Sequence, residues 1–410
     1  MRLLIILKQF LQDIRKQKLR TFLTTFGIVW GTAATVILVA FGEGLYKHQQ
    51  KQFHGLGDRI TIVWSGTTSK PFKGLPKSRR IRFTDEDVDM LKREIRGISL
   101  ASPEYDRNAQ ITYKRKTLSQ NLVGIYPEWG TARNIIPEAG GRFIDDIDQL
   151  YRKRVVFLGT KIRDNLFGEG VNPVGQYVTI IGVPFLVIGV MKDKDQNSSY
   201  SGRDRHKMFV ASSTFKTMFD RRYPDNMVYQ VAEGVSSRSV LKKVYETLGR
   251  KYKFDPDDEE ALMVWDTIRS EEQWKPFFEG FKIFLGIIGV FTLIVGGIGT
   301  ANIMYVVVKE RTREIGIKMA LGASRGHIMG QIIFESVLIT AIGGTCGFLI
   351  AKLFEIGFPK FGFGEYVGDP IIASDAVVVT ISIIGTIGFL AGLFPARRAS
   401  RLNPVEALRL

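Results

Sequence analysis

Four long stretches without a charged side chain are the feature that most constrains the fold. One lies near the start and three lie in the last third of the chain: Thr21–Gly42, Ile283–Val308, Ser336–Ala351 and Ala376–Ala396. A helix needs about 20 apolar residues to cross the hydrocarbon core of a membrane, and all but the third stretch reach that length. The spacing predicts four transmembrane helices in a 1+3 arrangement, with a large α+β extracytoplasmic domain inserted between helices 1 and 2.

Lysine and arginine are concentrated in three short segments beside these stretches. Residues 1–20, 309–331 and 397–410 together hold 15 basic and 4 acidic side chains, whereas residues 352–375 hold two lysines and four acidic side chains. Basic residues of short loops remain on the cytoplasmic side of a membrane. The charges therefore predict that both termini and the loop at 309–331 are cytoplasmic, and that residues 43–282 and 352–375 lie outside.

Residue periodicity adds detail to this division. Apolar side chains fall on one helical face of residues 1–20, which predicts an amphipathic helix at the cytoplasmic leaflet. In the outside domain we expect helices at Thr84–Ile95 and Ser236–Gly249, and an exposed flexible loop at 192–205. Strands are predicted at Arg59–Trp64, Ile111–Tyr113, Gln120–Ile125, Arg154–Leu158, Tyr177–Ile181, Val183–Val190, Met208–Ala211 and Met227–Val231. These patterns predict the following division of the chain: 1–20 cytoplasmic helix, 21–42 transmembrane helix 1, 43–282 outside domain of one or two subdomains, 283–308 helix 2, 309–331 cytoplasmic loop, 332–351 helix 3, 352–375 outside loop, 376–396 helix 4 and 397–410 cytoplasmic tail.

Several classes of protein are disfavoured by this sequence. The spans hold almost no ionisable side chain, Glu335 standing at the cytoplasmic edge of the third, so neither a proton relay nor an ion path is indicated. The net charge of +16 follows from topology and attraction to anionic lipids, which makes nucleic-acid binding a poor explanation. The four histidines lack metal-ligand spacing, and no G-x-S-x-G motif indicates a peptidase, so we predict neither a metal site nor catalytic residues. Cys346 is the only cysteine, which excludes an intrachain disulfide; we expect it to be a buried small apolar residue.

Glycines recur at four-residue spacing within the spans. Small residues let helix backbones approach closely inside a membrane, where no hydrophobic effect drives association. We therefore assign helix packing to nine positions: Gly27, Gly31, Gly296, Gly297, Gly299, Gly343, Gly347, Gly388 and Gly392. Packing within the bundle and packing in a dimer interface both remain open from the sequence.

The cytoplasmic loop reads KERTREIGIKMALGASRGHI from Lys309 to Ile328. A dense charged turn is followed by apolar residues, and Gly322 is predicted to stop a short amphipathic helix. Two interpretations remain open: a helix that contacts a partner, or a solvated basic loop that fixes topology. The tail forms a membrane-interface segment in which Pro395 ends the fourth span, Pro404 starts a last short helix, and three arginines reach lipid phosphates: Arg397, Arg398 and Arg401.

Segments along the whole chain resemble MacB-type (FtsX-like) ABC transporter permeases. ERTREIGIKMALGAS after the second span and PARRASRLNPVEALR at the end look like signature segments of that family, and LRTFLTTFGIVWGTAATVIL (Leu19–Leu38) looks like its first span. GGRFIDD (Gly140–Asp146) and VVFLGTKIRDNLFGEGVNPVGQYVTIIGVPFLVIGVM (Val155–Met191) resemble its periplasmic core domain. The resemblance implies a multi-pass protein of the bacterial cytoplasmic (inner) membrane.

The resemblance also implies a mechanism and partners. In such permeases the loop between spans two and three docks on a cytoplasmic ABC ATPase, and its motion is transmitted to the outside domain (mechanotransmission). Carried onto this sequence, the ATPase-coupling residues are Glu310, Arg311, Arg313, Glu314, Ile315, Gly316, Lys318, Leu321, Gly322 and Ala323. A second permease chain, identical or different, is expected, and the family admits a periplasmic adaptor and an outer-membrane channel. Membrane lipids are the remaining partner.

The sequence departs from family members that carry a fused ATPase before the first span. It holds no G-x-x-x-x-G-K-[ST] phosphate-binding loop, so we expect no cofactor on this chain and place ATP and Mg²⁺ on a separate ATPase subunit. An export or efflux permease that is not itself an enzyme is the favoured interpretation. The alternatives are a lipoprotein-releasing permease, and a regulatory protein that signals to a cell-wall hydrolase or sensor kinase without cargo.

Overall fold

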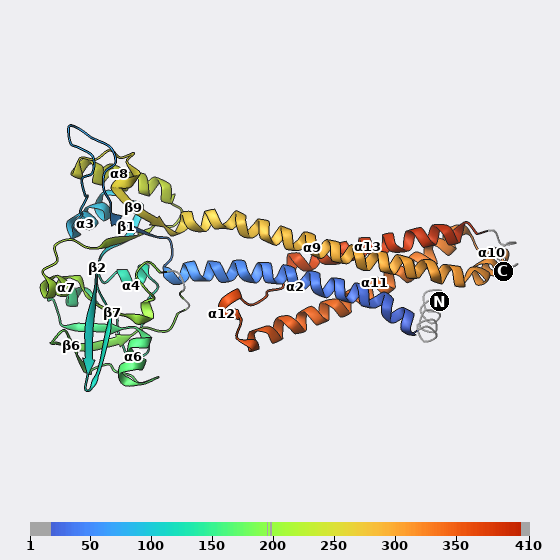
Figure 1. The fold of residues 1–410 in the computed structure, drawn as a ribbon, viewed down its shortest axis with the longest axis horizontal. Coiled ribbons are helices and arrows are strands. Elements are labelled where there is room, and N and C mark those ends of the chain that lie inside the picture. The colour runs from blue at the N-terminus through green and yellow to red at the C-terminus, as the bar shows by residue number, and fades with distance from the viewer. Residues whose placement is uncertain (1–17, 195, 197–198, 403–410) are drawn as a thin grey trace. The chain divides into compact units, whose positions relative to one another are not determined.

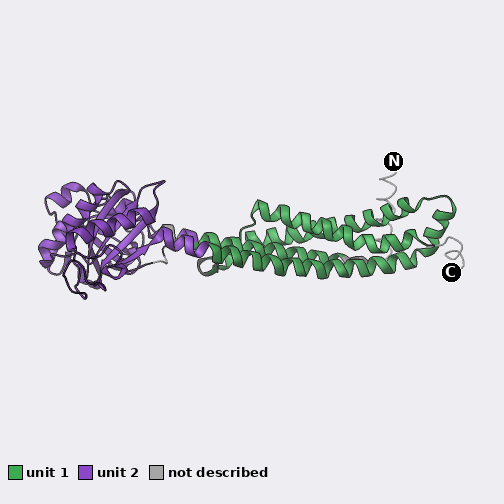
Figure 2. Ribbon diagram, turned by 90° about the horizontal axis from the view of Figure 1, so that it is seen from above, with its two compact units in different colours: residues 1–49, 276–410 green, residues 50–275 purple. Residues whose placement is uncertain are grey.

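The computed structural model describes residues 18–194, 196 and 199–402. Most of the amphipathic helix expected at 1–20 lies outside the described residues, and so does Pro404. The chain divides into two units, residues 1–49 with 276–410 (unit 1) and residues 50–275 (unit 2), coloured separately in Figure 2. Each unit has its own core.

Unit 1 is built from long helices. Four helices have the length and apolar composition to cross a membrane: α2 (Lys18–Leu56), α9 (Thr267–Glu310), α11 (Arg325–Gly357) and α13 (Ser374–Ser400). Three short helices connect them: α10 (Thr312–Ala320), η3 (Phe358–Phe361) and α12 (Gly364–Val367) (Figure 1). The 1+3 arrangement predicted from the uncharged stretches is confirmed.

The glycines assigned to helix packing lie mainly where these helices touch. A Cβ built on Gly296 of α9 would lie 2.7 Å from the carbonyl oxygen of Gly27 on α2, and one on Gly347 of α11 would lie 2.5 Å from that of Val29. Gly31 faces Thr292, Gly297 faces Ile387, Gly343 faces Ile28, Gly388 faces Thr340 and Gly392 faces Ser336. Gly299 differs, because no described atom lies within 4 Å of its would-be Cβ. Eight of the nine therefore lie at contacts inside one chain.

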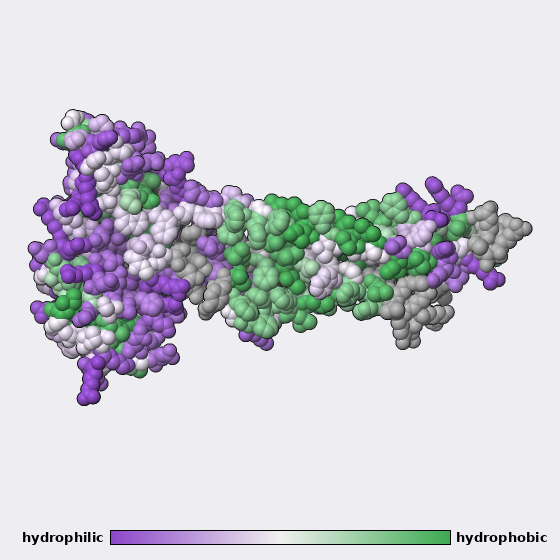
Figure 3. Space-filling view, viewed as in Figure 1, coloured by the Kyte–Doolittle hydropathy of each residue, from purple (hydrophilic) through white to green (hydrophobic). Residues whose placement is uncertain are grey.

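Apolar side chains cover the outside of these helices. Figure 3 shows a nearly continuous band of hydrophobic residues over unit 1, and hydrophilic residues gather at the end that carries α10. Large side chains such as Phe291 (64% exposed) and Leu353 (70%) project outward because the surrounding lipid is as apolar as they are. Cys346 was expected to be buried and is exposed on α11, so that expectation is wrong for the single chain.

Unit 2 is organised around one long strand. The first half of β2 (Ile98–Tyr113) pairs with β8 (Asn226–Val231). β8 pairs on its other side with β1 (Ile60–Ser65), and β1 pairs with β9 (Leu262–Asp266) at the edge of the sheet. The second half of β2 pairs with both β3 (Lys116–Ile125) and β5 (Tyr177–Ile180). The ladder returns through β6 (Val183–Val190), β4 (Val155–Leu158) and β7 (Lys207–Ala211) to β3, so six strands pair in a closed ring. Two lobes thus share β2.

Helices cover both lobes. α3 (Asp85–Glu94) and α8 (Ser237–Tyr252) pack on the β9–β1–β8–β2 sheet around Phe83, Val244 and Phe254. α6 (Thr160–Phe167) and α7 (Ser212–Phe219) contribute to the apolar core of the ring, and α4 (Trp129–Ala132), α5 (Asp146–Leu150) and η1 (Asp204–His206) complete that lobe. η2 (Glu259–Ala261) precedes β9 and places Ala261 in the core of the other lobe. The helices predicted at 84–95 and 236–249 are confirmed, and Thr84 precedes α3 with its N–H donating to Asp87 Oδ2 at 2.6 Å.

Two strands differ from the prediction. β9 was not predicted, and β2 was predicted only at residues 111–113 although it begins at Ile98. The added part of β2 contains Pro103, Glu104 and Asp106, which are poor strand formers. Tertiary contacts hold it instead, since Trp129 Nε1 donates to Glu104 at 2.5 Å and Asn121 Nδ2 donates to Asp106 at 2.8 Å.

A buried cluster of charges lies beside these residues in unit 2. Arg133 and Asp204 are both 0% exposed, and Arg133 Nη2 donates to the two carboxylate oxygens at 2.9 and 3.0 Å. Lys194 Nζ lies 2.9 Å and Lys207 Nζ lies 3.3 Å from the same carboxylate. Burial raises the pKa of Asp204, but the three cations outweigh it and hold that pKa well below its usual range. Burial lowers the pKa of Lys194 to about 8, more than Asp204 can offset.

The expectation of an exposed flexible loop at 192–205 is wrong for several of its described residues. Asp204 and Gln196 are buried, and Lys194 donates to the backbone oxygen of Arg133 at 2.7 Å. Asp204 N–H in turn donates to Gln196 Oε1 at 3.0 Å. The polar composition indicated solvent, but these side chains point inward because a buried arginine needs a counter-charge.

Candidate coupling surface

The loop between α9 and α11 folds into the short helix α10. Arg311 interrupts the helical path after Glu310, and α10 then runs from Thr312 to Ala320. Gly322 follows with a φ of 95°, a conformation that glycine adopts at little cost, and so ends the helix as predicted. Ser324 caps the next helix by accepting from the N–H of His327 at 3.3 Å. The segment is therefore an ordered helix between two long ones.

One face of α10 is anchored in an apolar core. Ile315, at 8% exposure, belongs to a cluster with Met304 and Val308 of α9 and Ile328 and Ile332 of α11. Ala396 and Ala399 of α13 complete this cluster. Gly316 is also buried, next to Ile315 in the chain. The inner face of α10 thus packs against three long helices, and a displacement of α10 requires each of them to move or to lose packing contacts.

Polar contacts reinforce the anchor. Arg311 Nη1 donates to Glu335 Oε2 at 3.1 Å, and Gln331 Nε2 donates to Glu335 Oε1 at 3.1 Å. Lys318 Nζ donates to Gln331 Oε1 at 3.3 Å. Glu335 itself is only 7% exposed. Arg311 and Lys318, which were assigned to partner contact, thus also tie α10 to α11 within the chain.

The opposite face of α10 is exposed and mixes charge with apolar surface. Arg313, Ile317 and Leu321 follow at four-residue spacing, which places them on one side of the helix. Ile317 is 43% and Leu321 is 84% exposed, the second being an unusual exposure for leucine at a helix end. The remaining assigned positions Glu310, Glu314 and Gly322 are exposed and Ala323 is half-buried. We call Arg313, Glu314, Ile317 and Leu321 the coupling surface.

The tail residues lie at the same end of unit 1. α13 continues through Pro395 to Ser400, so the helix extends beyond the residue predicted to end the fourth span. Arg397, Arg398 and Arg401 are exposed, and the Arg398 guanidinium lies 4.7 Å from the centre of the Tyr305 ring. Cations at a helix C-terminus also interact favourably with the helix dipole. Glu335 and Gln331 were not among the assigned site residues; their only sequence signal was a carboxylate one turn after an amide at the edge of a span.

Two family models together cover most of the chain. Residues 21–246 match the MacB-like periplasmic core domain, and residues 286–404 match the FtsX-like permease C-terminal domain. The chain belongs to the MacB-like permease family. The second match includes α10, so the coupling surface lies in the part of the chain that characterises FtsX-like permeases.

Relatives along nearly the whole chain support this membership. The chain is 30% identical over 405 residues to the macrolide export ATP-binding/permease protein MacB of Bdellovibrio bacteriovorus, covering 98% of this chain and 61% of the relative. It is 32% identical over 407 residues to the protein of the same name from Hyphomonas neptunium, covering 98% and 60%. The chain therefore spans about 60% of the length of these curated relatives. The periplasmic region of MacB from Actinobacillus actinomycetemcomitans aligns with 55% of this chain and 96% of its own, at 18% identity and a TM-score of 0.44.

Proposed function

We propose that this member of the family is the permease subunit of an ABC-type export complex of the bacterial inner membrane, with both termini in the cytoplasm. A cytoplasmic ABC ATPase on a separate subunit docks on the coupling surface. Its ATP-driven motion passes through α10 to the long helices and to the extracytoplasmic domain. Two permease chains form the membrane part of the complex.

The two-faced character of α10 carries this proposal. Its inner face packs against α9, α11 and α13, while its outer face exposes Ile317 and Leu321 beside Arg313. Exposed apolar side chains among charges are typical of a protein interface. A helix that only fixed topology would need the charges but would gain nothing from exposing Leu321. Because Met304 and Val308 of α9 share an apolar cluster with Ile315, a displacement of α10 acts directly on the C-terminal end of α9.

Two further observations support a partner that supplies the energy. The 410 residues contain no phosphate-binding loop of the G-x-x-x-x-G-K-[ST] type. The uncharged stretches of the membrane-length helices, residues 21–42, 283–308, 336–351 and 376–396, offer no charged side chain that could couple transport to an ion gradient. The proposal therefore assigns ATP and Mg²⁺ to the ATPase subunit, and assigns no catalytic residue to this chain.

Site-specific photo-crosslinking in the native host tests the docking. A crosslinking amino acid at position 321 is expected to capture an ABC ATPase, identified by mass spectrometry, whereas the same amino acid at the exposed Lys360 position is expected not to. If position 321 yields no nucleotide-binding protein, or both positions yield it equally, the docking proposal is wrong.

A charge swap then tests coupling separately from docking. Arg313→Glu combined with Glu314→Arg preserves net charge and helix propensity but reverses the pattern of charge on the coupling surface. We expect the permease-stimulated ATP hydrolysis of the complex to fall by about tenfold, because the swap places like charges against each other at the interface. Lys360→Glu is the control and should leave hydrolysis unchanged. Undiminished stimulation in the swapped variant would show that these charges do not couple the subunits.

A further inference from the structure

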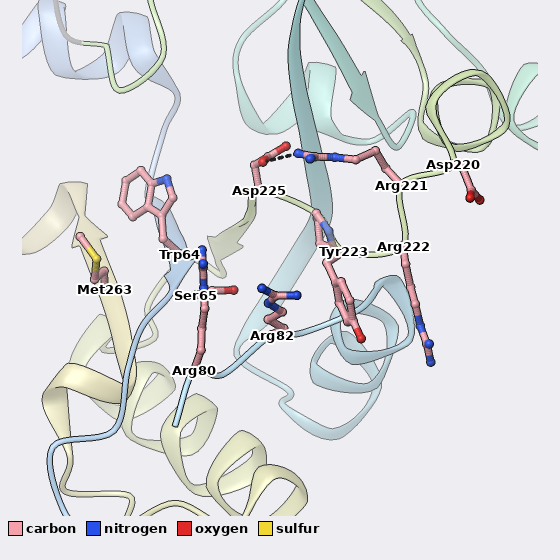
Figure 4. A pocket seen from close by; sticks show the side chains of 11 residues that line it. Trp64, Ser65, Arg80, Arg82, Asp220, Arg221, Arg222, Tyr223, Asp225 and Met263 are labelled. Carbon is pink, nitrogen blue, oxygen red and sulfur yellow. Dashed lines mark hydrogen bonds and ion pairs between the residues drawn. The ribbon is translucent and has the colours of Figure 1, made fainter. Parts of the chain in front are cut away.

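A groove of about 750 Å³ opens on unit 2, entirely within residues 50–275. Its walls are the end of β1 with Trp64, the extended segment 80–82, the loop 220–225 between α7 and β8, and Met263 of β9. Figure 4 shows Arg80 and Arg82 rising from one wall, and Arg221, Arg222 and Tyr223 rising from the other. We call this feature the arginine groove. Its volume is in the range of sites that bind small molecules or short peptides.

The first wall directs its arginines outward by simple alternation. Ile81 and Phe83 are 2% and 0% exposed and belong to the core beneath α3 and α8. In an extended chain, neighbouring side chains point to opposite sides, so Arg80 and Arg82 face the solvent. The segment is fixed in this conformation because Ile81 N–H donates to Gly66 O at 3.0 Å and Arg80 bridges Thr67. The two arginines are therefore displayed on an ordered backbone.

The second wall is held by an acidic residue that leaves one arginine unpaired. Asp225 accepts from the N–H of Asp106 at 2.8 Å and from Arg221 Nη2 at 2.6 Å. Pro224 is buried, which fixes the loop further. Arg221 is thus neutralised locally, whereas its neighbour Arg222 points away from Asp225 and lies on the other side of Tyr223 from Arg82 (Figure 4).

Three guanidinium groups of the groove lack a counter-charge. Within the described residues, no carboxylate oxygen lies within 4 Å of a guanidinium nitrogen of Arg80, Arg82 or Arg222, although ion pairs are frequent elsewhere in unit 2. The guanidinium carbons of Arg82 and Arg222 each lie 5.6 Å from the centre of the Tyr223 ring. Cation–π attraction to one ring offsets part of the repulsion between two like charges and pre-positions both. The groove thus holds three arginines without an ion-pair partner among the described residues, and its lining also includes the carboxylates of Asp220 and Asp225.

From this arrangement we infer that the arginine groove binds an acidic, peptide-like molecule that carries several separate carboxylates and an apolar side group. Guanidinium groups pair with carboxylates through two parallel hydrogen bonds. Figure 4 shows the guanidinium groups spread along the opening, which fits several single charges better than one phosphate. Trp64 and Met263, the latter 62% exposed, provide the apolar contact at the other side of the groove. This site lies in unit 2 and does not depend on the proposed docking of an ATPase to α10.

Calorimetric titration of the full chain in neutral detergent tests the inference. The probes are acetyl-Phe-Glu-Glu-Glu, its glutamine counterpart acetyl-Phe-Gln-Gln-Gln, and inorganic phosphate. We expect the glutamate peptide to bind, with an affinity that decreases as salt is added, and the glutamine peptide not to bind. Equal binding of the two peptides, no binding of the glutamate peptide, or binding of phosphate alone would each overturn the inference.

Matched double variants locate the site. Arg82→Gln with Arg222→Gln is expected to weaken binding of the glutamate peptide by at least about tenfold, because two charge-assisted contacts are lost. Arg96→Gln with Arg115→Gln removes the same charge from exposed positions of unit 2 outside the groove and should leave the affinity unchanged. All four arginines are exposed, and thermal unfolding checks that each variant is folded. An equal loss in both double variants would mean a general charge effect and would overturn the assignment to the groove.

Discussion

Replacing Asp204 by asparagine removes the negative charge that Arg133, Lys194 and Lys207 all contact, and preserves the size of the side chain. The carboxylate lies 2.9 Å from Arg133 Nη2 and from Lys194 Nζ, and 3.3 Å from Lys207 Nζ. Arg133 and Asp204 have no exposed surface and Lys207 is 2% exposed, so water cannot replace the lost partner. A second buried carboxylate near Arg133, that of Glu104, already accepts from Trp129 and Tyr200.

The expected magnitude follows from this burial. Removing one partner of a buried ion pair costs about 3–5 kcal/mol, because a buried charge is left uncompensated. Three cations depend on Asp204, so we expect the local stability of unit 2 to fall by at least about 3 kcal/mol. That loss corresponds to a roughly 100-fold increase in the equilibrium population of the open state.

Hydrogen exchange on the full chain measures this effect at the right place. Backbone amides of β7, which begins at Lys207, should exchange at least about 100-fold faster in Asp204→Asn than in the wild type. Glu94→Gln is the matched control, because its pair with Arg250 has side chains that are 48% and 74% exposed. Exposed pairs are worth about 0–1 kcal/mol, so exchange should change by less than about fivefold. Exchange in β7 of Asp204→Asn that stays within fivefold of wild type would refute the reasoning.

Three further predictions follow from the same structure. Gly296→Ala should lower the thermal stability of unit 1, because the new Cβ would lie 2.7 Å from a backbone oxygen of α2. Gly299→Ala is the control and should be neutral or slightly stabilising, because no atom of the described part of the chain lies within 4 Å of its new Cβ. Equal effects of the two substitutions would contradict the assignment of Gly296 to helix packing. The Lys194 pKa of about 8 lies below the unfolded value of 10.5, so the unfolded state binds more protons between these two pH values and the contribution of Lys194 to stability rises with pH across that window. From pH 8 to pH 10, the melting temperature of the wild type should therefore rise relative to that of Lys194→Met. A difference that does not change with pH would show that Lys194 does not titrate in this window. Glu335→Gln should speed amide exchange in α10 by roughly tenfold through the loss of the Arg311 contact, and unchanged exchange in residues 312–320 would argue against that anchor.

The extent of the fold that the sequence predicts differs between the two units. The membrane-length helices of unit 1 are strong signals because a long uncharged stretch has no other stable conformation in lipid. Local chemistry also predicts element ends, as at Gly322 and Thr84. The first half of β2 could not be predicted in this way, since Pro103, Glu104 and Asp106 disfavour strands and are held by partners far away in the chain. Local propensity is only a weak prior where such contacts exist.

The candidate site shows the same limit. The charged and apolar pattern at 309–328 predicted a short amphipathic helix, and the structure contains α10 there. The pattern alone did not separate inward from outward residues, because helical position gives a face but not the neighbour of that face. The structure turns Arg311 and Ile315 toward α11 and leaves Arg313 and Leu321 exposed.

What the sequence by itself determined is the type and order of the membrane-length helices and of most strands of unit 2, because apolar length, charge asymmetry and capping residues act over a few positions each. Only the tertiary structure decided the role of individual charges. Arg133, Arg311 and Arg82 are chemically the same residue, yet one is buried on Asp204, one ties α10 to Glu335, and one lies beside Tyr223 in an open groove. Their partners are 71, 24 and 141 residues away along the chain. The energy of a charge depends on its burial and its neighbours in space, and neither is encoded at its own position.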